Sequence, residues 1–118
     1  MPDLILRTQE TYDAYIKFIA DGFLGNGCNL CKDTPLKEFE HWKIIDTKFP
    51  WSRIAQTHHM AIPKRHIVYA ELNEDEKKEY ETIKIDYIEK GYDLIAEATN
   101  KKKSIPGHLH IHLIILKK

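Results

Sequence analysis

Hydrophobic and polar positions change their spacing several times along this chain. Between Thr8 and Asp21, tyrosines and isoleucines recur at three- and four-residue intervals and Gly22 follows, which predicts an amphipathic helix. Alternating or wholly apolar runs predict strands over 42–47, 57–62 and 107–116, with Pro63 ending the second of them. The first half of the chain therefore reads as a helix followed by two strands.

The strongest helix start is Asn73. Its side chain can accept from the free N–H groups of a first turn, and Glu76 occupies the matching position of a capping box. Apolar residues then keep to one stripe, which predicts a buried helix face from about Glu74 to about Ala98: Tyr80, Ile83, Tyr87, Leu94 and Ile95. The order αββαβ predicts an α+β domain in which an antiparallel meander is covered by helices.

Length and composition narrow the class of protein. The chain has 118 residues, which predicts one domain over 1–118. Eighteen basic residues balance eighteen acidic ones, so nothing favours nucleic acid or an acidic membrane as a partner, and 101–103 (three lysines) is read as a solvated loop. No apolar run approaches the ~20 residues that span a bilayer, and the start shows no export signal, so we expect a cytoplasmic protein. In that reducing compartment the two cysteines are metal ligands or free thiols sooner than a disulfide.

Seven histidines are the unusual feature, and three of them alternate with apolar residues in HLHIHLIIL, residues 108–116. On a strand these three imidazoles would share one face at roughly 6.5–7 Å spacing, with Leu109, Ile111 and Leu113 on the other. Imidazole rows serve either metal ligation or nucleophilic and acid–base chemistry near neutral pH. His41 and His59 are interpreted as ordinary surface or core polar residues.

This alternation resembles the signature of the histidine-triad (HIT) superfamily of nucleotide hydrolases and transferases. HHMAIPKRHI, residues 58–67, resembles the family's strand and turn, and Cys28-x-x-Cys31 resembles the cysteine pair of its zinc-bearing members. The three motifs follow in the family's order from Cys28 to the C-terminus, and 1–27 is interpreted as an N-terminal helical extension. The resemblance implies a HIT-like antiparallel meander packed with a long helix.

The resemblance also implies roles for single residues. His110, in the middle of the triad, would be the nucleophile, His112 a donor to phosphate, and His58 a further group beside the phosphate. Asp46 lies in the segment that supplies a ribose-binding acid, and Ser104 could supply a phosphate donor. A structural zinc ion would be held by four residues: Cys28, Cys31, His66 and His108. The alternative for the cysteines is two buried free thiols.

The implied activity is hydrolysis or transfer of nucleoside 5′-phosphoryl groups through a nucleotidyl-histidine intermediate, with a purine nucleotide or nucleotide conjugate as partner. The alternative is a catalytically impaired, zinc-stabilised nucleotide-binding or sensor module. That alternative depends on residues 103–107, where Ile105 and Pro106 stand in place of side-chain donors. The family also implies a homodimer, which the apolar run from Leu113 to Leu116 would favour if it formed a sheet edge.

Overall fold

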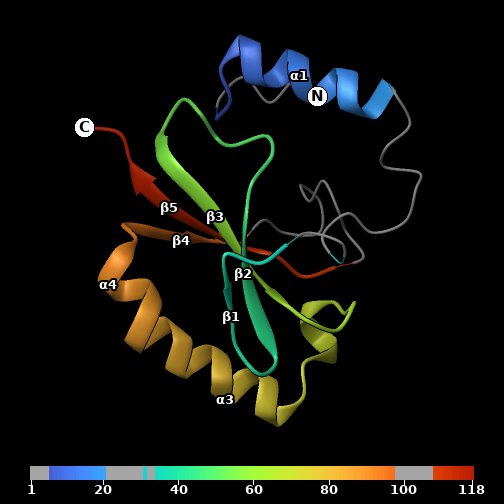
Figure 1. Cartoon of the computed structure of the whole chain (residues 1–118), viewed down its shortest axis with the longest axis vertical. Helices are drawn as coiled ribbons and strands as arrows, with labels where there is room; N and C mark the ends of the chain where they lie inside the picture. The colour runs from blue at the N-terminus through green and yellow to red at the C-terminus, as the bar shows by residue number, and fades with distance from the viewer. Residues whose placement is uncertain (1–5, 21–30, 32–33, 98–107) are drawn as a thin grey trace.

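The structure is a computed structural model that describes residues 6–20, 31, 34–97 and 108–118 (Figure 1). Its helical elements are α1 (Gln9–Ala20), the short turn η2 (Tyr69–Glu71), α3 (Glu74–Ile83), the π-helical turn η3 (Lys84–Ile88) and α4 (Glu89–Gly91). Its strands are β1 (Lys37–Glu38), β2 (Trp42–Asp46), β3 (Ala55–Pro63), β4 (Leu94–Ala96) and β5 (Ile111–Leu116). The strands pair antiparallel in the order β1-β2-β3-β5-β4, which confirms the predicted α+β class.

Strands β2 and β3 match the sequence predictions closely, whereas the short edge strands β1 and β4 were not predicted. The last strand begins at Ile111, so His108 and His110 precede the regular strand, and position 107 lies outside the described residues. The idea that Leu113 to Leu116 forms a sheet edge is wrong. Strand β5 lies between β3 and β4, and Leu113 pairs with both His59 and Ile95.

The long helix is shorter than predicted. It passes from α3 through η3 into α4 and ends at Gly91, after which Tyr92 is extended at φ −127° and ψ 153°. Leu94 and Ile95 then form β4 against β5 and are 43% and 38% exposed, so they are not part of a buried helical stripe. The free edge of β5 supplies hydrogen-bond partners that a continued helix could not use, and Gly91 is a weak helix former at the point of the break.

The other part of the predicted stripe packs as expected: Ile83 is buried, and Tyr80 and Tyr87 pack against the same core. Ile88, which the stripe did not include, is also buried there, in a core that contains Trp42, Ile44, Ala61, Leu109, Ile111 and Leu113. Asn73 caps α3 as predicted: its side chain accepts from the Glu76 N–H at 2.8 Å, and Glu76 accepts from the Asn73 N–H at 2.9 Å.

The opposite face of the sheet carries the histidines His58 and His112. Residues alternate between faces along a strand, so His58 and Met60 of β3 point away from α3, as does His112, the register partner of Met60. Ile45, Met60 and Ile62 form a small apolar cluster on this face. Figure 1 shows α3 and α4 on one side of the sheet and α1 on the other. Within the described residues, no helix is long and apolar enough to span a bilayer.

Candidate functional site

Two groups of side chains gather at the start of β5. The first, the thiol–imidazole cluster, consists of Cys31, His66 and His108. The Cys31 Sγ lies 3.4 Å from Nδ1 of His66 and 3.3 Å from Nδ1 of His108, and one ligand atom from each residue lies within 4.8 Å of the others. Ligands of a tetrahedral zinc ion, at about 2.3 Å for sulfur and about 2.0 Å for nitrogen, are separated by about 3.5 Å. The two sulfur–nitrogen distances match this spacing, so three of the four predicted ligands, Cys31, His66 and His108, could hold a metal ion.

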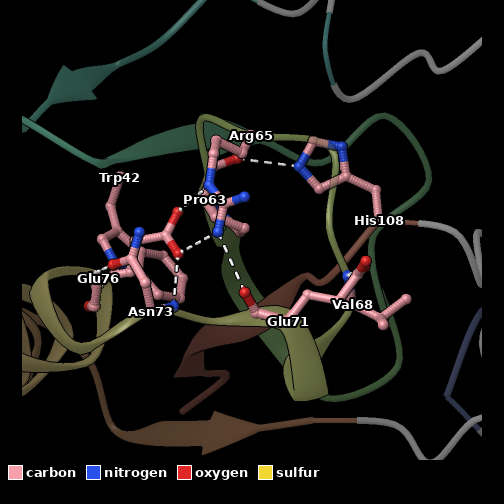
Figure 2. A network of polar contacts seen from close by, with 8 residues as sticks. All are labelled: Trp42, Pro63, Arg65, Val68, Glu71, Asn73, Glu76 and His108. Carbon is pink, nitrogen blue, oxygen red and sulfur yellow. Dashed lines mark hydrogen bonds and ion pairs between the residues drawn. The ribbon is translucent and has the colours of Figure 1, made fainter.

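His108 is oriented by the main chain. Its ring is fully buried, and Nε2 lies 2.9 Å from the carbonyl oxygen of Pro63, to which it donates (Figure 2). This bond places the proton on Nε2 and leaves a lone pair on Nδ1, the nitrogen that faces Cys31. Burial lowers the pKa of His108, which favours the neutral ring that a metal ion needs.

The turn that carries Pro63 and His66 is fixed to α3 by an ion pair whose carboxylate is buried and whose guanidinium is half exposed. Arg65 donates from Nε and Nη2 to the two carboxylate oxygens of Glu76 at 2.9 and 2.7 Å, and Nη2 also donates to the Glu71 carbonyl (Figure 2). The Glu76 side chain is 1% exposed, and the hydrogen bonds from Arg65 hold its pKa below the usual range. Glu76, which forms the capping box of α3 with Asn73, therefore also holds the turn that carries His66 of the thiol–imidazole cluster.

The second group, the imidazole cluster, consists of His58, His110 and His112. His58 Nδ1 lies 2.9 Å from the main-chain nitrogen of Trp51 and accepts its hydrogen. In the neutral ring the proton is therefore on Nε2, which lies 2.8 Å from Nδ1 of His112 and donates to it. His112 must then carry its own proton on Nε2. One main-chain N–H thus sets the tautomers of two imidazoles in series.

His110 receives the opposite tautomer. Its Nδ1 lies 2.9 Å from the carbonyl oxygen of His108, so Nδ1 carries the proton and Nε2 keeps the lone pair. The rings of His110 and His112 are 5.2 Å apart and nearly perpendicular. The cluster therefore places an imidazole with its lone pair on Nε2 beside an imidazole that carries its proton on Nε2.

Burial keeps two rings of the imidazole cluster, those of His58 and His112, neutral. His58 is 3% exposed and its pKa is lowered to about 4, first by burial and then by the positive charge of Arg7. The pKa of His112 is lowered to about 3, first by burial and then by the neighbouring His58. Both rings are uncharged at neutral pH, which is the state that the hydrogen-bond chain requires.

The remaining predicted site residues are less closely associated with either cluster. Asp46 lies at the end of β2, is exposed, and accepts from the adjacent Thr47 N–H at 2.8 Å; its charge raises the pKa of His58 slightly against the larger lowering effects. Cys28 and Ser104 lie outside the described residues. His59 points to the other face and meets the Tyr92 hydroxyl at 2.6 Å, in agreement with the core role assigned to it.

Three residues near the clusters were missed by the sequence reasoning. Trp51 contacts both His58 and His112. Lys43 is 9% exposed on β2, and its Nζ lies 3.5 Å from the Cys31 carbonyl oxygen. Arg7 is 8% exposed and lies in the N-terminal extension. A lysine within an otherwise apolar strand was the one available signal, since the other two positions depend on contacts distant in sequence.

The comparisons with known proteins agree with this arrangement at the level of the fold. Neither protein-family models nor curated proteins give a match to the sequence. Among solved structures, the chain is similar to a HIT family hydrolase from Legionella pneumophila Philadelphia 1, with a TM-score of 0.58 and 22% sequence identity. The match covers 78% of this chain and 95% of that one. The five-stranded antiparallel sheet, its helices and this similarity together establish that the chain has the HIT superfamily fold.

Proposed function

We propose that this protein binds nucleotides and hydrolyses or transfers nucleoside 5′-phosphoryl groups through a covalent intermediate on His110. The observation that carries the proposal is the pair of opposite tautomers in the imidazole cluster. The His108 carbonyl leaves a lone pair on Nε2 of His110, and the chain from Trp51 through His58 leaves an N–H on Nε2 of His112. An imidazole that can act as a nucleophile therefore lies beside an imidazole that can act as a donor.

The proposed first step forms a bond between Nε2 of His110 and the α-phosphorus. The bond from phosphorus to the leaving group breaks at the same time, and the leaving group departs with its electron pair. The N–H of His112 stabilises the charge that develops on the phosphoryl oxygens. Water then attacks the phosphorus, the P–N bond breaks with its electron pair returning to Nε2 of His110, the proton lost by water passes to the solvent, and the nucleoside monophosphate leaves. In the transferase version an acceptor hydroxyl replaces water.

We propose that the thiol–imidazole cluster holds a structural zinc ion, with Cys28 as the fourth ligand. The donor set supports this, because a thiolate and two neutral imidazoles at 3.3–3.4 Å suit zinc better than harder cations. Such an ion would join the Cys28-x-x-Cys31 motif to the turn at His66 and to His108 at the start of the triad, and it would contribute folding energy. His108 would then serve the metal and not the substrate.

The decisive experiment compares His110→Ala with the unmodified protein and with His41→Ala, a histidine outside both clusters. Each protein is mixed with radiolabelled adenosine 5′-phosphoramidate, quenched rapidly, and examined for labelled protein and for turnover. We expect His110→Ala to lose the labelled adduct and several orders of magnitude of rate, with zinc content and folding unchanged. His41→Ala should behave as the unmodified chain. Wild-type turnover by His110→Ala would contradict the mechanism.

A binding-only protein is the second candidate, favoured by Ile105 and Pro106 in the position of the family's phosphate donors. It predicts that the unmodified chain binds adenosine or guanosine monophosphate in calorimetry but forms no labelled adduct.

We expect a purine nucleotide as ligand, a cytoplasmic location, and a homodimer in which an exposed sheet edge pairs. Of the two edges, β4 is the more apolar. Light scattering that gives a monomer mass over a wide concentration range would exclude the dimer.

A further inference from the structure

The N-terminal segment, residues 6–20, is fixed to the connection between β2 and β3, residues 47–54. Arg7 Nε donates to the Phe49 carbonyl at 2.9 Å, and the Arg53 N–H donates to the Leu6 carbonyl at 2.8 Å. The Thr8 N–H donates to the Ser52 hydroxyl at 3.1 Å. Main-chain groups on both sides therefore hold the two segments together, although they are more than 40 positions apart in sequence.

Side chains reinforce the same contact. The hydroxyl groups of Thr8, Thr11 and Ser52 lie within 2.7–3.1 Å of one another. The rings of Tyr15 and Phe18 pack against Phe49 at centroid distances of 5.5 and 5.1 Å. In Figure 1, α1 lies close to the bend of the connection. The N-terminal segment thus contacts the β2–β3 connection on both sides of Trp51, at Phe49 and at Ser52 and Arg53.

The connection in turn places Trp51 on the imidazole cluster. The Trp51 N–H donates to His58 Nδ1 at 2.9 Å, and its ring stacks on His112 with a centroid distance of 4.2 Å and an interplanar angle of 29°. The same ring lies 5.0 Å from that of His58. One residue therefore fixes the tautomer of the first imidazole through its main chain and the orientation of the second through its side chain.

We propose that Trp51 is a positioning residue of the imidazole cluster, and that the N-terminal segment is part of the active site because it holds Trp51 in place. The proposal rests on the proposed function for the reaction that is positioned, but the positioning itself can be measured without turnover. Arg7 is the main anchor: its buried guanidinium bonds to Phe49 and lies 4.9 Å over the Tyr15 ring.

Charges around the cluster act in the same direction as burial. Arg7 lowers the pKa of both His58 and His112. His110 also lowers both, His59 lowers that of His58, and Asp46 opposes these effects at His58. Loss of the Trp51 ring would admit water to His112, so its pKa should rise toward the ordinary value of about 6.5. The ionisation of His112 is therefore a direct measure of whether Trp51 is in place.

Three substitutions in the full chain separate the two contributions of Trp51. Trp51→Phe keeps the ring stack and the N–H, Trp51→Ala removes the ring alone, and Trp51→Pro removes both ring and N–H. Nitrogen-15 NMR of the imidazoles reports tautomer and pKa for each histidine. We expect Trp51→Ala to keep the His58 tautomer but to raise the pKa of His112 by one unit or more. Only Trp51→Pro should change the His58 tautomer, and Trp51→Phe should resemble the unmodified protein.

Arg7→Ala tests the anchor, with Arg53→Ala as the matched control, because the exposed Arg53 side chain leaves its main-chain bond to Leu6 intact. Because Arg7→Ala also removes a positive charge that lowers the pKa of His112, Arg7→Lys is measured beside it. Arg7→Lys keeps the charge but loses the Nε–H bond to Phe49, and it should still raise the pKa of His112, whereas Arg53→Ala should not. Adduct formation from adenosine 5′-phosphoramidate should fall about 100-fold in Trp51→Ala.

The NMR and activity measurements fail independently of each other. An unchanged His112 pKa and His58 tautomer in both Trp51→Ala and Trp51→Pro, with folding retained, would overturn the positioning role. If the unmodified protein forms no adduct, the proposed function is wrong, and the NMR result still decides the role of Trp51. If the histidines shift as expected but Trp51→Ala forms adduct at the wild-type rate, positioning by Trp51 has no catalytic effect and the inference is overturned.

Discussion

Replacement of Glu76 by alanine removes the carboxylate that joins α3 to the turn bearing His66. That carboxylate is 1% exposed and accepts two bonds from Arg65, at 2.9 and 2.7 Å, and one from the Asn73 N–H at 2.9 Å. Removal of one partner of a buried ion pair costs about 3–5 kcal/mol, and loss of a capping interaction about 1 kcal/mol. Because the Arg65 side chain is 52% exposed, water restores much of its hydration, so we expect a total loss of about 3 kcal/mol.

Urea unfolding followed by circular dichroism measures this loss. With a slope of about 1.5 kcal/mol/M, the midpoint should fall by about 2 M. The control is Glu74→Ala, in the same turn of α3: Glu74 is 80% exposed, 3.8 Å from Lys77 Nζ, and should change stability by less than about 0.5 kcal/mol. Glu76→Ala should also weaken zinc binding, because the released turn carries His66. If Glu76→Ala and Glu74→Ala lose the same small amount, the ion pair does not hold the turn.

Three further predictions concern titration, metal and the opposite face of the sheet. The folded-state pKa values of His58 and His112, about 4 and about 3, lie below the ordinary 6.5, so the unfolded chain binds protons first. In metal-free protein, stability should be full above pH 7 and fall by about 1.4 kcal/mol per pH unit for each histidine between pH 6 and 4; a flat urea midpoint would refute this. Chelation should lower the free energy of unfolding of zinc-loaded protein by about 4 kcal/mol if zinc exceeds its Kd 1,000-fold. It should have no effect on Cys31→Ser. Tyr92→Phe should cost about 1 kcal/mol in the same assay, because it removes the hydroxyl partner of His59, and should leave zinc content unchanged.

Local rules predicted those parts of the fold whose contacts are close in sequence. The capping box of Asn73 and Glu76 spans three residues, so a single turn contains all the atoms involved. The alternation in β3 and β5 likewise identified Leu113 as a core position and His112 as a residue of the other face. Three members of the predicted zinc site, Cys31, His66 and His108, also lie together, but that prediction came from the family resemblance and not from a local rule.

The end of the long helix could not be read from the sequence. Leu94 and Ile95 satisfy the helical stripe that begins at Tyr80, and they also suit an edge strand. The choice between helix and strand depends on β5. The Ile114 carbonyl of β5 accepts from the Asp93 N–H at 2.8 Å, and Leu94 pairs with Ile114 in the sheet. Tertiary pairing therefore overrides helical periodicity here. Because Gly91 is a weak helix former, ending the helix at this residue sacrifices little helix stability.

The roles of the histidines have a similar origin. All are the same residue type, and alternation alone would make those of the triad equivalent. Main-chain groups distinguish them: the Trp51 N–H and the carbonyls of Pro63 and His108 each bind one ring nitrogen. The His108 carbonyl binds Nδ1 of His110, so His110 has its lone pair on Nε2. The Pro63 carbonyl binds Nε2 of His108, so His108 has its lone pair on Nδ1, which faces the Cys31 thiol.

This distinction has a consequence that does not depend on the family resemblance. If His110 and His112 exchanged roles, His112 would have to attack through Nε2. Its Nδ1 accepts from His58, so Nε2 carries a proton and has no lone pair in the neutral ring. Moving that proton would require His58 to change tautomer and to give up the hydrogen bond from the Trp51 N–H, which would leave a buried donor unpaired at a cost of about 1–3 kcal/mol. The hydrogen-bond chain therefore favours His110 over His112 in the proposed role of nucleophile by a factor of about 5 to 150, before any difference in position relative to the substrate is considered.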